Sequence, residues 1–428
     1  MRNRSRGKRK IVLDNGMTVM FLNTPTQTIT GRLRVYHGGL NERAGEEGLA
    51  HFLEHSIMCG GGRNHSPEEA RKRYETFAMI NANTSPISTQ FTTDIIAEDL
   101  ESFLIIISDI VFHPRLDKTA IEQERRRILR EMMDRRNSPY YKHQRDFVKA
   151  RYGINSPFSY DTLGKISVIK NASSRELRAF HSRGYNPNNM DLILVGGLPE
   201  NFEDLVTRYF KDEKKGHIER YDLPEDPGVK RQTVLQRYDP DLYNKSDPEE
   251  SSASLAMCFL APPIESEDAY VVSKLANILG SDFDTNSRLF KRISQEMGLT
   301  YAIHSQYENR EKTGSFNIHG KVQAKKKDKA IDAIFEEMDI LKEEPIDPEA
   351  LNNMNRKNDY FIAKFQESNA GQCTLLEHEL DTGMTPEMLR QRAKSVTPEM
   401  IQAAARRYFP TDRESGKYVM LLRNPLKE

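Results

Sequence analysis

The sequence lacks several features that would place it in a specialised class of protein. Its three cysteines, Cys59, Cys258 and Cys373, are far apart and odd in number. This usage is typical of a reducing compartment and argues against a framework of disulfide bonds. No apolar run approaches the roughly 20 residues that a membrane-spanning helix needs. We therefore expect no membrane partner.

The sequence also lacks an excess of either charge, because Lys plus Arg and Asp plus Glu both number 63. No overall field selects nucleic acid, and we expect no nucleic-acid partner. The first ten residues, MRNRSRGKRK, are rich in Lys and Arg, but no apolar core of a secretory signal follows them. We expect a cytoplasmic protein, with a removed presequence as an open alternative. A solvated terminus is favoured over a nucleic-acid-binding tail.

The 428 residues, 37% of them hydrophobic and 29% charged, are enough for roughly two to three globular domains. Residues 10–22 alternate apolar and polar around Asp14-Asn15-Gly16, which predicts a β-hairpin, and residues 29–39 predict a further strand. Strands followed by groups of helices predict an α+β fold with a sheet covered on one face. Helical periodicity is found in residues 46–58, 67–80, 97–112 and 117–136.

The two halves of the chain contain related segments, which indicates an internal duplication. Each segment predicts a capped helix followed by an apolar strand. The matched pairs, all at one offset, are Ser174 and Thr397, Glu176 and Glu399, Leu177 and Met400, Tyr185 and Tyr408, and Pro187 and Pro410. We expect an N-terminal domain over 1–220, a linker and loop over 221–250, and a homologous C-terminal domain over 251–428.

The stretch GLAHFLEHSIMCGG, residues 48–61, places two histidines on one face of a predicted helix. His51 and His55 are four positions apart, so their imidazoles can bind one cation, and neutral imidazoles suit zinc. Glu54 reaches the same side and can take a proton from water without binding the metal. The arrangement H-x-x-E-H is the inverzincin signature. The alternative is a helix whose histidines are ordinary surface or core residues.

A catalytic zinc site needs a third protein ligand and keeps its fourth position for water. The predicted helix 117–136 offers Glu124 and Glu131, which are about two turns apart on one face. One of them is expected to bind the metal and the other to support a ligand from behind. Without the histidine pair, these acidic residues on an Arg-rich helix would be interpreted as part of a solvated ladder of ion pairs.

These motifs, together with LDNGMTVMF, NANTSPISTQFT and YNPNNMDLILVGGL, resemble the pitrilysin/insulinase family of zinc metallopeptidases over nearly the whole chain. The chain length is similar to the half-length branch, which includes mitochondrial processing peptidase subunits and related bacterial enzymes. The resemblance implies two homologous α+β domains, each with a mostly antiparallel sheet covered on one face by helices. It also implies that such a half-chain forms half of a clamshell around a chamber, where peptides or unfolded segments are cleaved.

The resemblance assigns roles by position. It implies Zn²⁺ bound by His51, His55 and Glu131, with Glu54 as the base and Glu124 as the supporting carboxylate. Asn81 and Ala82 are implied to contact substrate, which adds as a strand to a sheet edge. Without the resemblance, Asn81 would be interpreted as a turn residue. Cys59 and His65 lie near the metal helix, but the resemblance gives them no role.

The C-terminal half departs from the family pattern at one position. The family has an arginine seven residues before a tyrosine, both of which bind substrate, whereas this chain has Ser294 before Tyr301. Arg292 is two residues out of step, roughly 200° around a helix. We therefore expect a zinc-bearing subunit that pairs with a second half-length subunit, a heterodimer being favoured over a homodimer that uses Arg292. Tyr301 is alternatively a strand residue packed on the sheet.

Two rival functions remain. The first is a non-catalytic or structural subunit of a related complex, although such chains usually lose the zinc motif. The second is a nucleic-acid-binding protein that uses the basic N-terminus, which the neutral charge of the rest of the chain disfavours. Peptide hydrolysis by a zinc-dependent endopeptidase is the favoured function.

Overall fold

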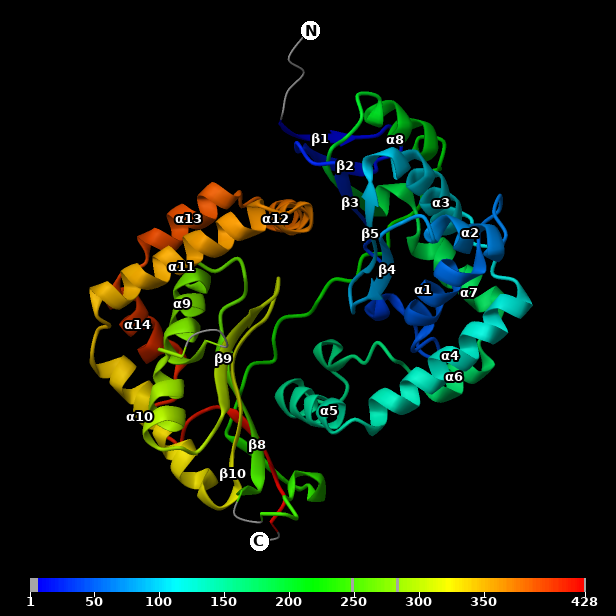
Figure 1. The fold of residues 1–428 in the computed structure, drawn as a ribbon. Coiled ribbons are helices and arrows are strands. Elements are labelled where there is room, and N and C mark those ends of the chain that lie inside the picture. The colour runs from blue at the N-terminus through cyan, green and yellow to red at the C-terminus, as the bar shows by residue number, and fades with distance from the viewer. Residues whose placement is uncertain (1–6, 248–249, 282–284, 427–428) are drawn as a thin grey trace. The chain divides into compact units, whose positions relative to one another are not determined.

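The computed structural model describes residues 7–247, 250–281 and 285–426 (Figure 1). The chain divides into two compact units, each with a sheet and helices of its own. Unit 1 consists of Met1–Arg135, Tyr160–Asp222 and Ile362–Thr385, and unit 2 consists of Arg136–Ser159, Leu223–Phe361 and Pro386–Glu428. A segment from each side of the predicted linker thus belongs to the opposite unit: Arg136–Ser159 to unit 2 and Ile362–Thr385 to unit 1. In the described residues, no helix has both the length and the apolar character needed to cross a membrane.

Unit 1 is built on a six-stranded sheet with the order β1-β2-β6-β3-β5-β4. Neighbouring strands are antiparallel, except that β2 and β6 are parallel. Gly16 has φ 84° in the turn between the first two strands, so the predicted hairpin is confirmed. The strands are β1 (Lys8–Val12), β2 (Thr18–Asn23), β3 (Thr28–Val35), β4 (Met79–Thr84), β5 (Thr89–Ile96) and β6 (Met190–Gly196).

Helices cover one face of this sheet. Phe52 and Ile57 of the first helix and Phe103 of the third are fully buried in the core between the helices and the sheet. The helix predicted over 67–80 ends early, because Met79 and Ile80 pair with β5 as the start of β4. The helices are α1 (Leu49–Gly60), α2 (Pro67–Tyr74), α3 (Leu100–Phe112), α4 (Lys118–Asn137), α6 (Ile166–Asn171), α7 (Ser174–Gly184) and α8 (Phe202–Phe210).

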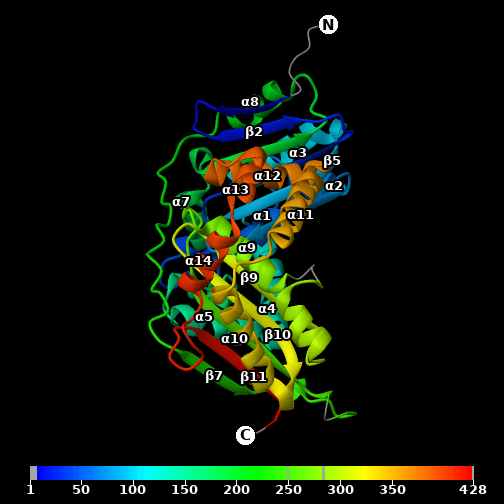
Figure 2. The ribbon, with the colours of Figure 1, turned by 90° about the vertical axis from the view of Figure 1, so that its left-hand side faces the viewer.

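Unit 2 repeats this architecture with a five-stranded sheet of order β7-β11-β8-β10-β9. β7 and β11 are parallel, as Figure 2 shows, and the other neighbours are antiparallel. This order matches β2-β6-β3-β5-β4, which confirms two related domains in an α+β fold. The strands are β7 (Thr233–Tyr238), β8 (Ser252–Ala261), β9 (Ala302–Asn309), β10 (Gly314–Gln323) and β11 (Val419–Asn424).

The helices of unit 2 follow the strands in the corresponding order. Leu275 of the first and Ile334 of the second are fully buried against the sheet. A π-helix, Phe290–Glu296, contains both Arg292 and Ser294. The α-helices on this side are α9 (Ala269–Gly280), α10 (Lys327–Glu343), α11 (Pro348–Gln366), α13 (Pro386–Ser395) and α14 (Pro398–Tyr408).

Each sheet is also partly covered on its opposite face by a helix from the other half of the sequence. In unit 1, α12 (Asn369–Thr382) packs Cys373 and Leu376 on Met20, Ile193 and Val195. In unit 2, α5 (Pro139–Tyr152) packs Phe147 on a cluster that includes Cys258, Val419 and Leu421. The resemblance implied helices on one face, and these two helices are an addition to that arrangement. The packing of α12 explains why every residue of β6 is buried.

The duplicated helices α7 and α14 are capped in the same way. The hydroxyls of Ser173 and Thr397 accept hydrogen bonds from backbone N–H groups three residues later. These caps pair Ser173 with Thr397, whereas the sequence comparison pairs Ser174 with Thr397. The predicted alignment of the two helices is therefore wrong by one residue. The apolar strands β6 and β11 follow these helices as predicted.

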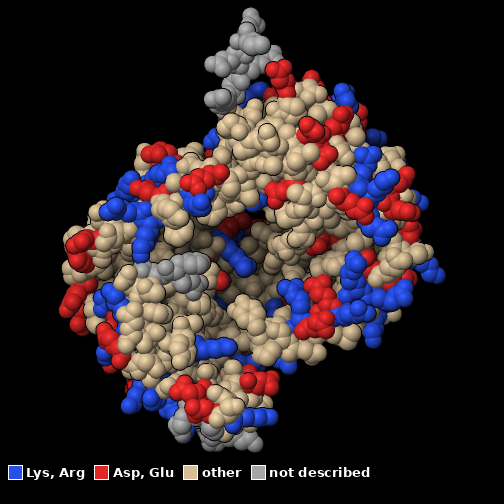
Figure 3. Space-filling view, in the orientation of Figure 1, with Lys and Arg blue, Asp and Glu red and all other residues tan. Residues whose placement is uncertain are grey.

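Charged side chains of both signs are interspersed over the surface in Figure 3. No large area of one sign is visible on that face. The distribution agrees with the equal numbers of basic and acidic residues in the sequence.

Candidate metal centre

The two histidines of α1 lie side by side, and α4 brings a carboxylate to them. The ring centroids of His51 and His55 are 4.7 Å apart. Their Nε2 atoms lie 3.7 and 3.6 Å from Oε2 of Glu131. Zinc bonds of about 2.0–2.2 Å in a tetrahedron place donors roughly 3.3–3.6 Å apart. The spacing and the chemistry of the three donors therefore fit zinc.

In the described part of the chain, His51, His55 and Glu131 form a group that can bind a metal ion, because one donor atom of each lies within 4.8 Å of the others. His51 and His55 are mostly buried, with 12% and 18% of their side chains exposed, whereas 33% of Glu131 is exposed. Burial, and then the neighbouring His55, lowers the pKa of His51 to about 3. The imidazole of His51 is therefore neutral near pH 7, as metal binding requires.

Glu124 lies behind His55 and not beside Glu131. Its Oε2 is 3.2 Å from Nδ1 of His55, which leaves Nε2 of that ring toward Glu131. Glu124 is 5% exposed and also accepts a hydrogen bond from Arg127 at 3.2 Å. Burial raises the pKa of Glu124, but the bond from His55 and the charge of Arg127 outweigh it and lower the pKa overall. A carboxylate here sets the tautomer and orientation of a metal-binding histidine.

Glu54 is buried on α1, the helix that also carries His51 and His55, and 7% of its surface is exposed. Its Oε2 accepts a hydrogen bond of 2.6 Å from the hydroxyl of Thr84, at the end of β4. Burial is the main reason why the pKa of Glu54 is raised, although the bond from Thr84 and the charge of His55 oppose the shift. A carboxylate with a raised pKa is a stronger base than an exposed one.

A hollow of about 330 Å³ opens over these groups. Asn81 and Ala82 line it from β4, which is the edge strand of the sheet. Oδ1 of Asn81 accepts a hydrogen bond of 2.9 Å from the backbone N–H of Ala82. The hollow is lined by His51, Glu54, His55, Met58, Cys59, Asn81, Ala82, Asn83, Thr84, Arg127, Glu131, Arg135 and Thr162.

Two residues of the predicted substrate contacts belong to unit 2. Tyr301 precedes β9 and is 94% exposed, so it is not packed on the sheet. The guanidinium of Arg292 lies 3.1 Å from Glu296 and 3.3 Å from Glu336. Neither residue lines the hollow of unit 1.

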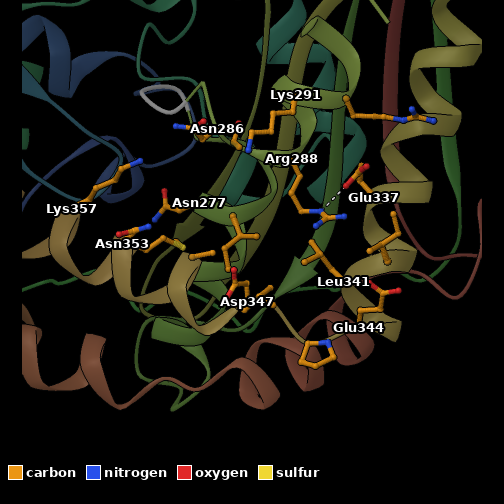
Figure 4. A pocket seen from close by; sticks show the side chains of 18 of the residues that line it. Asn277, Asn286, Arg288, Lys291, Glu337, Leu341, Glu344, Asp347, Asn353 and Lys357 are labelled. Carbon is orange, nitrogen blue, oxygen red and sulfur yellow. Dashed lines mark hydrogen bonds and ion pairs between the residues drawn. The ribbon is translucent and has the colours of Figure 1, made fainter. Parts of the chain in front are cut away.

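Unit 2 has a hollow of its own, of about 1230 Å³, between α9, the π-helix, α10 and α11 (Figure 4). Its lining contains neither histidine nor cysteine. Arg288 and Glu337 form an ion pair of 2.6 Å in its wall, and Arg292 lines it as well. Its basic and acidic groups are present in similar numbers, so the lining offers no evident set of metal ligands.

Thr84, Arg127 and Arg135 line the metal hollow but were missed in the sequence analysis. A signal for Thr84 existed, because it is two positions from Ala82 and so on the same face of the strand. Cys59 also lines the hollow; its sulfur lies 3.5 Å from Nη1 of Arg127, and burial raises the pKa of its thiol to about 11. His65 is bound instead to Asp109 at 2.8 Å.

Two family models match the chain in succession. Residues 18–164 match the insulinase family, peptidase family M16, and residues 171–358 match the peptidase M16 inactive domain. A Bacillus subtilis protein named uncharacterized zinc protease YmxG is 23% identical over 409 residues, which cover 94% of this chain and 96% of that protein. The mitochondrial-processing peptidase subunit beta of Caenorhabditis elegans is 29% identical over 205 residues, 48% of this chain and 44% of that protein.

Solved structures show the same fold. A protease from Helicobacter pylori has a TM-score of 0.84 at 19% identity, covering 98% of this chain and all of that one. The first half of the periplasmic protease PqqL from Escherichia coli has a TM-score of 0.81 at 17% identity, with 98% of this chain and 92% of that chain covered.

Proposed function

Because the chain belongs to the pitrilysin/insulinase family of peptidases, in its half-length form, we propose that it is a zinc-dependent endopeptidase. Its substrates would be peptides or unfolded protein segments. The observation that carries this proposal is the convergence of His51, His55 and Glu131 on one point, with Glu54 in the same hollow. The presence of the whole donor set disfavours the alternative of a non-catalytic subunit.

In this proposal, Nε2 of each histidine and a carboxylate oxygen of Glu131 would hold the zinc. The chemistry that zinc would supply when bound is Lewis-acid polarisation of the scissile carbonyl and of water. Glu54 accepts a proton as the water oxygen bonds to the carbonyl carbon, and then gives a proton to the amide nitrogen as the C–N bond breaks. Glu124 acts through His55, whose ring it orients.

The substrate is proposed to bind along β4. No strand in the described part of the chain pairs with the outer edge of β4, so an extended peptide can add to it through backbone hydrogen bonds. Asn81 and Ala82 line the hollow from the same strand and would contact the peptide near the scissile bond. Tyr301, whose ring is exposed, is the other residue proposed to contact substrate.

A second half-length subunit is the proposed partner, in a heterodimer and not a homodimer. Ser294 stands at the position where the family has an arginine, and it has no cationic group to replace that residue. Arg292 is engaged by Glu296 and Glu336 on its own surface. The partner would therefore supply the missing contact to the substrate.

Glu54→Gln provides the test of the proposed function. The variant should keep zinc but lose about 10²–10⁴-fold in turnover, because the amide cannot accept the proton. Zinc per chain is measured by mass spectrometry, and cleavage with a quenched peptide library, on the chain alone and with a candidate partner subunit. Glu68→Gln, a surface change on α2, is the matched control and should behave as the unaltered protein. Full activity of Glu54→Gln would refute the assignment.

A further inference from the structure

Thr84 is the residue that holds the proposed base in place. It ends β4, is 9% exposed, and lies on the inward face of the strand, where burial alternates with the exposed Asn81 and Asn83. Its hydroxyl donates the 2.6 Å hydrogen bond to Oε2 of Glu54. Among the described residues, the donors to this carboxylate are the hydroxyl and the backbone of Thr84. A glutamate side chain has three rotatable bonds and can adopt many orientations. The hydrogen bond from the Thr84 hydroxyl therefore decides which orientation the carboxylate takes.

The position of Thr84 is itself tightly determined. Its backbone pairs with Thr89 at the closed end of the β4–β5 hairpin. The turn is closed by a hydrogen bond of 2.8 Å from the N–H of Ser85 to the carbonyl of Ser88. Thr89 is fully buried, and its hydroxyl donates to the carbonyl of His37 at 3.0 Å. The hydroxyl of Thr84 is therefore presented by a rigid element, as accurate positioning of a reacting group requires.

We propose that Thr84 is a positioning residue that fixes the carboxylate of Glu54 and couples it to the edge strand β4. The inference rests on the proposed function. Asn81 and Ala82 on β4 line the same hollow as Glu54, so the strand that would hold the peptide also holds the base. The carboxylate of Glu54 would thus lie at a fixed distance from a peptide bound along β4, before the reaction begins.

The expected effect falls on turnover and not on substrate affinity. Thr84→Val keeps the shape of the side chain but removes the hydroxyl donor, so Glu54 loses the 2.6 Å hydrogen bond that holds its Oε2. We expect kcat to fall about 10–100-fold, as for a small misplacement of a catalytic group, while KM changes less than about threefold. Thr84→Ser keeps the hydroxyl and should retain most of the turnover.

The controls separate the hydroxyl from the packing of the hairpin. Thr93 lies on β5, is fully buried, and donates its hydroxyl to the carbonyl of Met79 at 2.7 Å without contacting Glu54. Thr93→Val should therefore lower stability as much as Thr84→Val but leave kcat unchanged. Thr84→Ala and Thr84→Ser form a second pair, which differ by the hydroxyl alone and serve if the valine variant does not fold.

The experiment measures kcat, KM, zinc content and thermal midpoint for the unaltered protein and the four variants, using the full chain with any partner it needs. Crystal structures of Thr84→Val and Thr84→Ser add a readout apart from activity. The inference predicts a turned Glu54 carboxylate in the first variant and the original orientation in the second. Equal kcat for Thr84→Val and the unaltered protein, or equally low kcat for Thr84→Ser and Thr84→Ala, overturns it.

The two levels of proposal fail in different ways. If Glu54→Gln is inactive while Thr84→Val is fully active, the base stands and the positioning role is wrong. If Glu54→Gln keeps full activity, the proposed mechanism is wrong, and the role of Thr84 is overturned with it.

Discussion

The five strands of the unit 2 sheet have the same order as β2-β6-β3-β5-β4 of unit 1. The two units nevertheless differ sharply in the side chains of the first α-helix after the corresponding strands β3 and β8. α1 and α9 both have 12 residues and follow β3 and β8. At the third, sixth and seventh positions, α1 has His51, Glu54 and His55. At the same positions, α9 has Val271, Lys274 and Leu275, and both apolar residues are buried in the core.

The contrast is clearest at the buried charged position. Glu54 of unit 1 is an acceptor held by Thr84. Lys274 of unit 2 donates to Asn355 of α11, and burial lowers its pKa to about 8. A cation at this place repels a divalent metal, so unit 2 uses the position for a structural polar pair. The comparison teaches that the sheet and helix scaffold is independent of the chemistry placed on it.

The two units also resemble each other in how they are joined along the chain. The outer face of each sheet is covered by a helix from the opposite half of the sequence, α12 in unit 1 and α5 in unit 2. α12 is further attached by an ion pair of 2.5 Å between Arg32 and Glu377. Each half of the sequence therefore completes the core of the other half's sheet.

The most severe way to break the contrast is to remove one donor. His51→Ala should abolish both zinc binding and measurable turnover, because two donors hold the ion far more weakly than three. His304→Ala, on β9 of unit 2, is the control and should keep both. The readouts are zinc per chain and peptide cleavage. Unchanged zinc in His51→Ala would show that the ion binds elsewhere.

A pair of core substitutions compares α12 and α5, the helices that cover the outer faces of the two sheets. Ile193 under α12 and Leu421 under α5 are both fully buried. Truncation of either to Ala should lower the free energy of unfolding by about 2–5 kcal/mol, because it leaves a cavity. Denaturant unfolding, followed with one probe in each unit, measures the loss. An effect below about 1 kcal/mol at either residue would mean that its helix packs loosely.

Buried histidines should make both units lose stability in acid. Burial is the main cause that lowers the pKa of His181 in unit 1 and His319 in unit 2 to about 4. Unfolded histidines take up protons near pH 6.5, so the unfolded state binds more protons below that value. The stabilisation is complete above about pH 6.5 and is lost as the pH falls toward 4.

The measurement for this effect is the thermal midpoint of the zinc-free protein between pH 7 and pH 5. His319, which also faces His304 and His143, is replaced by Gln to test unit 2 alone. The midpoint of His319→Gln should fall less steeply with acid than that of the unaltered protein. An identical slope would show that His319 is not held neutral.

The smallest expected effect is at the edge strand. Asn81→Ala should raise KM about 3–10-fold with little change in kcat, as expected for the loss of one hydrogen bond to bound substrate. Asn201→Ala, at the exposed residue before α8, lies outside the hollow and is the control. Steady-state kinetics on one peptide would separate the two variants. Equal KM for both would remove Asn81 from the substrate contacts.

Sequence periodicity predicted most elements of the candidate metal site because their patterns are local. The hairpin around Gly16, the helix with His51 and His55, and the helix with Glu124 and Glu131 were all expected where they are found. The helix over 67–80 was predicted too long, because pairing with β5 outweighs the helical spacing of Met79 and Ile80. The duplication was recognised, but its alignment needed the caps at Ser173 and Thr397.

The sequence by itself determined the chemistry available to this protein, since H-x-x-E-H on one helix places two imidazoles and a carboxylate on one face whatever surrounds them. Only the tertiary structure decided which distant carboxylate meets them. Glu124 and Glu131 are on the same helix, and the packing of α4 against α1 puts one behind His55 and the other between both rings. The bond from Thr84 to Glu54 and the exchange of α5 and α12 depend equally on contacts between remote segments, which a local pattern does not specify.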